Sequence, residues 1–182
     1  MRKIVKRLGV TVALLSATPL IAAWPGNVTV IDAKKGSTET KGTLSAGAPI
    51  PLEWAAASSM ACFTAPAFPH YQGNHTFFAT TIPPRSKMKI TVTPTPTPKD
   101  PKADINVYAY MIADNGFRLP PEITSAVTCE ASPDSGKAAK PGPETIKLNN
   151  PKPKGSFNVL IGVAGAKGVV GGDFNVTVTL EQ

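Results

Sequence analysis

Two short stretches decide the fold: MKITVT at residues 88–93 and FNVTVTL at residues 174–180. In both, an apolar side chain alternates with a polar one, and successive side chains of a β-strand point to opposite faces of its sheet. The two stretches therefore predict strands that lie half-buried in an antiparallel sheet, with one apolar face against a core and one polar face toward water.

Further strands follow from the same reasoning. Residues 105–112 and 157–163 are largely apolar, which predicts central strands covered on both faces. Residues 94–98 predict a stiff polyproline-like loop, and the Ala-rich residues 55–61 a helical turn. Shorter strands are predicted at residues 28–31, 50–54, 76–80, 124–129 and 145–148. Nine strands separated by turns predict an all-β fold, an antiparallel and jelly-roll-like β-sandwich of eight or nine strands.

Composition agrees with this class. The chain has 182 residues, of which 42% are apolar and 17% charged, and its 19 Pro and 15 Gly favour short segments between turns. The net charge of +7 comes partly from four basic residues among the first seven. Beyond them 15 basic and 12 acidic residues remain, and the lysines are spread singly along the chain. Nucleic-acid binding is therefore not predicted.

Residues 1–23 have the parts of a secretory signal peptide. Residues 1–7 are basic, residues 8–21 form an apolar run, and Ala23 is a small residue of the kind that precedes signal peptidase cleavage. The run of about 14 residues is shorter than the ~20 that span a bilayer. We expect cleavage after Ala23 and a single domain, residues 24–182, that is secreted or periplasmic and not inserted in a membrane.

Cysteine usage fits an oxidising compartment. The mature chain holds Cys62 and Cys129, an even count that favours a disulfide. Such a bridge would stabilise the fold by about 4 kcal/mol on chain-entropy grounds. The alternatives are a redox pair, which usually has the spacing C-x-x-C, and a zinc site, to which only His70 and His75 could add ligands.

Motifs of catalysis are not found in the sequence. It contains no G-x-S-x-G elbow and no phosphate-binding Walker loop. His70 and His75 would lie on opposite faces of a strand, which makes them a poor metal pair. Tyr108 and Tyr110 share one face of their strand, so they form either a ligand-binding strip or part of the core.

Later segments carry a resemblance to a known family. Residues 102–108 read KADINVY and residues 171–178 read GGDFNVTV. They are similar to the DADLDLYV segment and to the closing G-D-Y-x-L-x-V strand of the bacterial pre-peptidase C-terminal domain, a small secreted β-sandwich. The resemblance runs over about residues 74–180, and we take residues 74–182 as the family-like core of the domain. Residues 24–73 would form an N-terminal extension of one or two strands that carries Cys62.

The resemblance implies an accessory binding module without catalysis, here with no attached peptidase. Some relatives hold calcium near the position of Asp104, so Asp100, Asp104 and Asn106 are candidate calcium ligands. Calcium needs six to eight oxygen ligands, and a polar turn is the alternative interpretation. No other cofactor is expected.

The function predicted from the sequence is recognition of an extracellular or envelope protein or polysaccharide. One alternative is a structural envelope component that self-associates through an edge strand. The other is a small secreted hydrolase whose site is built by loops.

Overall fold

The computed structural model describes residues 23–57, 61–96, 103–113, 116–123, 125–133 and 142–182. Strands make up most of its regular structure. In chain order the elements are β1 (Val28–Val30), β2 (Gly36–Thr43), η1 (Leu44–Ala46), α1 (Glu53–Ala57), η2 (Ala65–His70), β3 (His75–Ile82), β4 (Ser86–Thr95), β5 (Ile105–Ile112), β6 (Thr128–Ser132), β7 (Glu144–Asn150), β8 (Phe157–Gly165) and β9 (Asp173–Glu181), where η marks a 3-10 helix.

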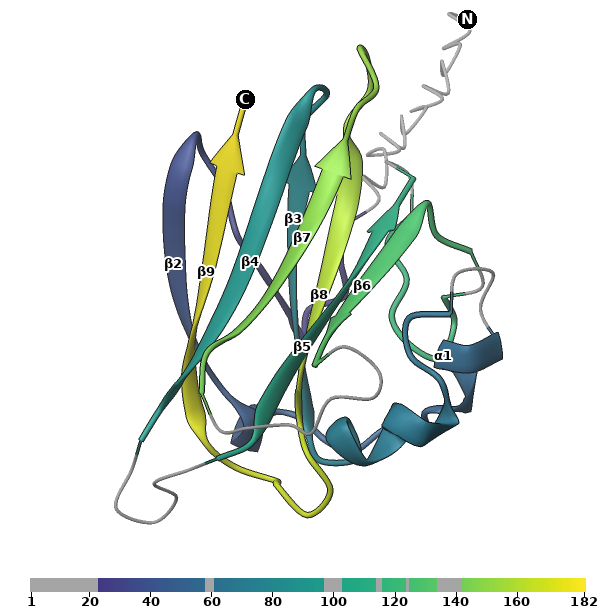
Figure 1. Cartoon of the computed structure of the whole chain (residues 1–182), viewed down its shortest axis with the longest axis vertical. Helices are drawn as coiled ribbons and strands as arrows, with labels where there is room; N and C mark the ends of the chain where they lie inside the picture. The colour runs from purple at the N-terminus through teal and green to yellow at the C-terminus, as the bar shows by residue number, and fades with distance from the viewer. Residues whose placement is uncertain (1–22, 58–60, 97–102, 114–115, 124, 134–141) are drawn as a thin grey trace, which may run out of the picture.

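The strands form two sheets that pack face to face (Figure 1). Sheet A has five strands in the order β1-β3-β8-β5-β6, and sheet B has four in the order β2-β9-β4-β7. Every neighbouring pair is antiparallel except β1 with β3, which is parallel. The predicted antiparallel β-sandwich is confirmed.

The main core lies between the two sheets. Burial alternates along β4 and β9, as their sequence pattern predicted, so their apolar side chains point inward and their Thr, Lys and Asn side chains point outward. Inward side chains from sheet B meet those of sheet A in one cluster that includes Met88, Ile90, Val92, Val176, Val178, Val107, Ile161 and Val163. Burying these apolar side chains is the main source of stability for such a layered fold.

A second core covers the other face of sheet A. The segment that holds α1 and η2 lays Trp54, Phe63 and Tyr71 over Tyr108 and Tyr110 of β5. Residues of β5 and β8 are therefore buried on both faces, which confirms that these strands are central and covered on both sides. Figure 1 shows α1 and the neighbouring helical turns on the side of sheet A away from sheet B.

Several element predictions need correction. The strand predicted at residues 50–54 is wrong, because α1 begins at Glu53 and because Leu52 and Trp54 pack on sheet A. They belong to the segment of residues 50–57 and 61–71 that lies on this face of the sheet, which we call the cover. Strand β2 was not predicted. The strand predicted at residues 124–129 begins at Thr128 and ends at Ser132. The predicted polyproline-like loop begins inside β4, since Pro94 pairs with Phe174, and its residues 97–98 lie outside the described residues.

None of the helices in the described ranges has the length and hydropathy of a membrane-spanning segment. The predicted signal peptide lies, except for Ala23, outside the described residues.

Candidate binding face

The two tyrosines predicted as a possible binding strip lie in the second core. Tyr108 and Tyr110 do share one face of β5, and both are fully buried under Trp54. The ring of Tyr108 also lies on the backbone of β8 at Gly162, where a Cβ atom would collide with it. The core interpretation therefore holds, and these side chains are not on the surface.

His75 is locked into the same core. Its Nε2 donates to the carbonyl oxygen of Tyr71 at 2.6 Å, and the hydroxyl of Tyr108 lies 3.0 Å from its Nδ1. Because a carbonyl can only accept, Nε2 carries the proton and Nδ1 accepts from Tyr108. Burial lowers the pKa of His75 from its usual 6.5 to about 4, and the Tyr71 hydrogen bond opposes this more weakly. His75 is therefore a neutral structural side chain at pH 7.

The same burial acts on its partner. Removal from water, followed by the nearby Tyr110 and Tyr71, raises the pKa of Tyr108 well above its usual value of 10. The two histidines do not share a strand as predicted, because His70 ends η2 while His75 begins β3. The aromatic cluster is thus a core that contains the hydrogen-bonded pair of His75 and Tyr108.

The candidate calcium ligands lie at the start of β5. Asn106 is fully buried, and its amide donates to the carbonyl oxygen of His70 and to Oδ1 of Asp104, at 2.8 and 3.1 Å. Asp104 is half-buried, and Asp100 lies outside the described residues. Among the side chains that the structure places, no group of three or more His, Cys, Asp or Glu could hold a metal ion. The Asn106 amide instead ties β5 to the end of η2.

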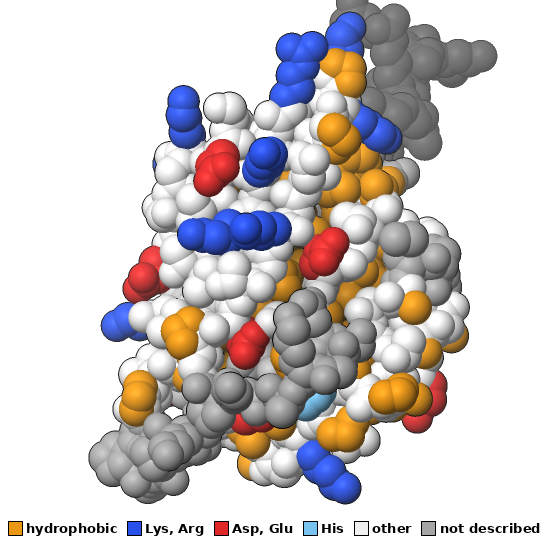
Figure 2. Space-filling model, viewed as in Figure 1, with side chains coloured by type: hydrophobic (Ala, Val, Ile, Leu, Met, Phe, Trp, Pro, Cys, Tyr) orange, Lys and Arg blue, Asp and Glu red, His pale blue; other side chains and the backbone are white. Residues whose placement is uncertain are grey.

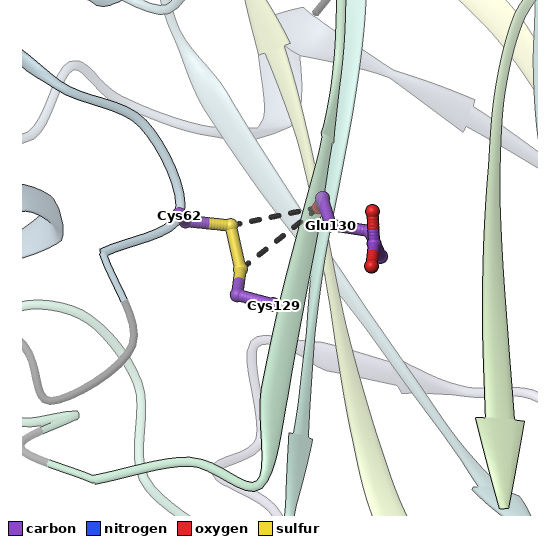
Figure 3. Close-up of a disulfide and its surroundings, with 3 residues drawn as sticks. All are labelled: Cys62, Cys129 and Glu130. Carbon is purple, nitrogen blue, oxygen red and sulfur yellow. Dashed lines mark hydrogen bonds between the residues drawn. A yellow bond between two sulfur atoms is a disulfide. The ribbon is translucent and has the colours of Figure 1, made fainter.

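The predicted disulfide is present. Cys62 and Cys129 are bonded, with a Cα–Cα distance of 5.0 Å across 67 positions of sequence. The carbonyl oxygen of Glu130 lies beside both sulfur atoms (Figure 3). Because Cys62 belongs to the cover and Cys129 to edge strand β6, the bond fastens the cover to sheet A.

The outer face of sheet B is the broad sheet face left open by this arrangement. The strand registers place its side chains in rows across the sheet. One row holds Thr179, Lys89 and Lys147, and the next holds Thr177, Thr91 and Thr145. Cross-strand hydroxyl hydrogen bonds of 2.9 Å join Thr91 to Thr145 and Ser37 to Thr179. The face is therefore polar, with regular rows of side chains that are hydrogen-bonded across the strands.

Basic side chains gather on one part of this face. Lys89 of β4 lies directly opposite Lys147 of β7, and Lys87 lies two residues away on the same side of β4. Together with Asn149 and Glu181 these three lysines line a shallow depression of about 490 Å³. In Figure 2 the blue Lys and Arg side chains gather over the upper half of the visible face, with fewer acidic ones among them.

Two adjacent turns extend the basic region. The backbone N–H of Arg85, in the β3–β4 turn, donates to the carbonyl oxygen of Lys152, in the β7–β8 loop. The Asn150 amide donates to carbonyl oxygens of both turns, at Pro83 and Gly155. We use the name basic face for a set of six residues: Arg85, Lys87, Lys89, Lys147, Lys152 and Lys154.

Sequence reasoning missed the basic face. It treated the lysines as single charges in solvent, because residues 87–89 and 147–154 are far apart in the chain. The alternation in residues 88–93 predicted that Lys89 points outward, and the burial pattern of β7 places Lys147 outward as well. The register that pairs Lys89 with Lys147 is a property of the folded sheet.

Comparisons with known proteins give little. No family model matches the sequence, and no curated protein matches it. Among solved structures, the chain is similar to PliG of Aeromonas hydrophila, a periplasmic lysozyme inhibitor of g-type lysozyme. The identity is 13%, the match covers 85% of this chain and 98% of that chain, and the TM-score is 0.37. The likeness is weak in both sequence and superposition.

Proposed function

We propose that this chain is a secreted or periplasmic binding module that acts without catalysis and recognises a macromolecule of the cell envelope or the surrounding medium. The observation that carries the proposal is the outer face of sheet B, which is polar and exposed and gathers Lys87, Lys89 and Lys147 on β4 and β7. Both faces of the central strands β5 and β8 of sheet A are buried, so these strands offer a ligand no open face. The buried titratable side chain of His75 is enclosed in the second core and held in place by its hydrogen bonds.

The resemblance to pre-peptidase C-terminal domains is part of this proposal. Strands β3 to β9 span the segment that resembles the family, and the Gly-rich turn at Gly171 and Gly172 leads into β9. Residues 24–73 add β1 to sheet A, β2 to sheet B and the cover with Cys62. Domains of that kind act as accessory modules, which supports binding over catalysis.

Self-association is the second function that an observation favours. Strand β2 is an eight-residue edge of sheet B, and an edge strand presents unpaired backbone groups to another chain. Its exposed Glu39 and Lys41 are charged residues of the type that discourages edge-to-edge pairing. We therefore favour a different macromolecule as the partner, with concentration-dependent oligomers as the sign of the alternative.

Site-specific photo-crosslinking tests the proposal. A diazirine side chain replaces Thr177, at the centre of the sheet B face, and in a matched control it replaces Ala57, which is exposed on the cover. The exported protein is then irradiated with envelope extract. We expect a crosslinked adduct at position 177 and none at 57. Adducts confined to position 57, or turnover in hydrolase assays that one substitution abolishes, would overturn the proposal.

A further inference from the structure

We infer that the partner of the basic face is an acidic polysaccharide, a linear glycan that carries carboxylate or phosphate groups along its length. The inference rests on the proposed function and names the class of its partner.

The pairing of Lys89 with Lys147 is the first observation. Neighbouring strands lie about 4.8 Å apart, and like charges directly opposite each other destabilise a sheet. Within the described ranges, the ion pair that forms within 4.0 Å is Lys34 with Asp32, so neither Lys89 nor Lys147 has a carboxylate oxygen that close. The fold keeps a repulsion that an external anion would relieve.

The layout of the charges is the second observation. Lys87 and Lys89 lie about 7 Å apart along β4, since a strand rises about 3.4 Å per residue. The turns carry the same sign of charge onward through Arg85, Lys152 and Lys154, and the register places one acid, Glu181, opposite Lys87. Lys152 is held over the Phe157 ring, with its Nζ 4.7 Å from the ring centroid. Positive charge is therefore concentrated on Lys87, Lys89 and Lys147 and in the turns that adjoin their end of the sheet, a layout that fits a polymer with repeated negative groups.

The neighbouring side chains suit a sugar chain. Thr91, Thr145, Thr179 and Asn149 present hydroxyl and amide groups beside the lysines. Such groups both donate and accept hydrogen bonds, which is what sugar hydroxyls require. Of these side chains, Asn149 lines the depression together with the three lysines and Glu181, and the depression is open to solvent on one side.

Other anionic partners fit the face less well. Protein interfaces are enriched in Tyr, Trp and Arg and depleted in Lys. Single-stranded nucleic acids bind on stacking aromatic side chains, and membrane surfaces are bound by inserted apolar ones. Where the structure places side chains, the large apolar residues that are exposed are Val30, Val127 and Val170, and none of them belongs to a strand of sheet B. An acidic glycan can bind through charged and hydrogen-bonding side chains, without stacked aromatic or inserted apolar ones.

Binding of defined polymers to the exported protein tests the inference. The probes are polygalacturonate, which carries carboxylates, phosphorylated dextran, which carries phosphates, and unmodified dextran as a neutral control. A variant of the basic face is compared with a control variant that loses the same charge elsewhere. The first is Lys89→Gln with Lys147→Gln, and the second is Arg118→Gln with Lys167→Gln.

We expect wild-type protein to bind one or both acidic polymers and not dextran. The face variant should bind at least tenfold more weakly at low salt, and the control variant less than threefold more weakly. The dependence of log K on log salt should also become less steep in the face variant, because fewer counterions are released. Its melting temperature should be unchanged or higher, since a like-charge pair is removed.

Several outcomes would overturn the inference. One is equal loss in both variants, which would mean that net charge alone attracts the polymer. Others are absence of binding to both acidic polymers, and tighter binding of wild type to duplex DNA, to phosphatidylserine vesicles or to polyglutamate. If polymer binding fails while crosslinking at position 177 persists, the inference is refuted and the proposed binding function still stands.

Discussion

Acidification should destabilise the fold through one buried side chain. His75 is 2% exposed and neutral, with both ring nitrogens hydrogen-bonded, and its pKa is about 4 in the folded chain. In the unfolded chain a histidine titrates near 6.5. Between these values the unfolded state binds a proton that the folded state does not, so the free energy of unfolding falls as the pH falls from 6.5 toward 4.

The size of the effect follows from the two pKa values. Each unit of difference corresponds to about 1.4 kcal/mol, so between pH 7.5 and pH 4.5 the contribution of His75 should decrease by roughly 2 to 3 kcal/mol. This is a large share of the roughly 5 to 15 kcal/mol that stabilises a typical domain. Below pH 4 the folded state also takes up the proton, and the contribution no longer changes.

Urea unfolding at both pH values, on wild type and on His75→Gln, isolates this term. Glutamine cannot gain a proton, but its amide can donate to the Tyr71 carbonyl and accept from the Tyr108 hydroxyl. Carboxylates titrate alike in both proteins, so they cancel in the difference. We expect the advantage of wild type over the variant to shrink by about 2 to 3 kcal/mol at pH 4.5. A difference that stays constant with pH, or a His75 imidazole that titrates near pH 6.5 in spectra of the folded protein, would refute the argument.

Three further predictions concern stability. Replacing Cys62 and Cys129 together by Ala should lower the free energy of unfolding by about 4 kcal/mol, because the bond closes a long loop. An unchanged urea midpoint, or free thiol in the exported protein, would speak against this. Gly162→Ala should cost roughly 1 to 3 kcal/mol, since the fixed ring of Tyr108 fills the space, and a melting temperature equal to that of wild type would show that the ring moves. Calcium should raise the melting temperature only slightly, through Asp104. A saturated site with calcium at 100 times its dissociation constant would add about 2.7 kcal/mol, and a large shift lost in Asp104→Ala would reveal such a site.

Strands with a strong pattern could be predicted from the sequence because one physical rule governs them. Alternation in residues 88–93 and 174–180 reflects one buried and one exposed face, and the structure shows that burial pattern. Residues 105–112 are apolar because two cores cover them. A strand buried on one face alternates apolar and polar residues, and a strand buried on both faces is apolar throughout, so the number of buried faces can be read from the sequence.

Elements outside this rule were missed or misplaced. Strand β2 has the sequence GSTETKGT, which lacks large apolar residues. It pairs as an edge strand, and its inward position Gly42 has no room for a side chain against the rings of Phe78 and Phe174. At residues 50–54 a short apolar run fits a strand or a helix equally well. Its Leu52 and Trp54 are part of the cover and pack on sheet A, and no periodic pattern in the sequence predicts such a layer.

The basic face depends on register, and register is fixed by the sheet as a whole. Shifting β7 by one residue against β4 would turn Lys147 toward the core and Leu148 toward water, so burial of Ile146 and Leu148 forces Lys147 outward. A shift by two residues would keep Lys147 outward but would move it from Lys89 to another row. The observed register is held by contacts at the strand end, where Asn150 ties the two neighbouring turns together. Core packing and turn geometry together therefore place Lys89 opposite Lys147. The repulsion between these two lysines, acting alone, would favour a register in which they are farther apart.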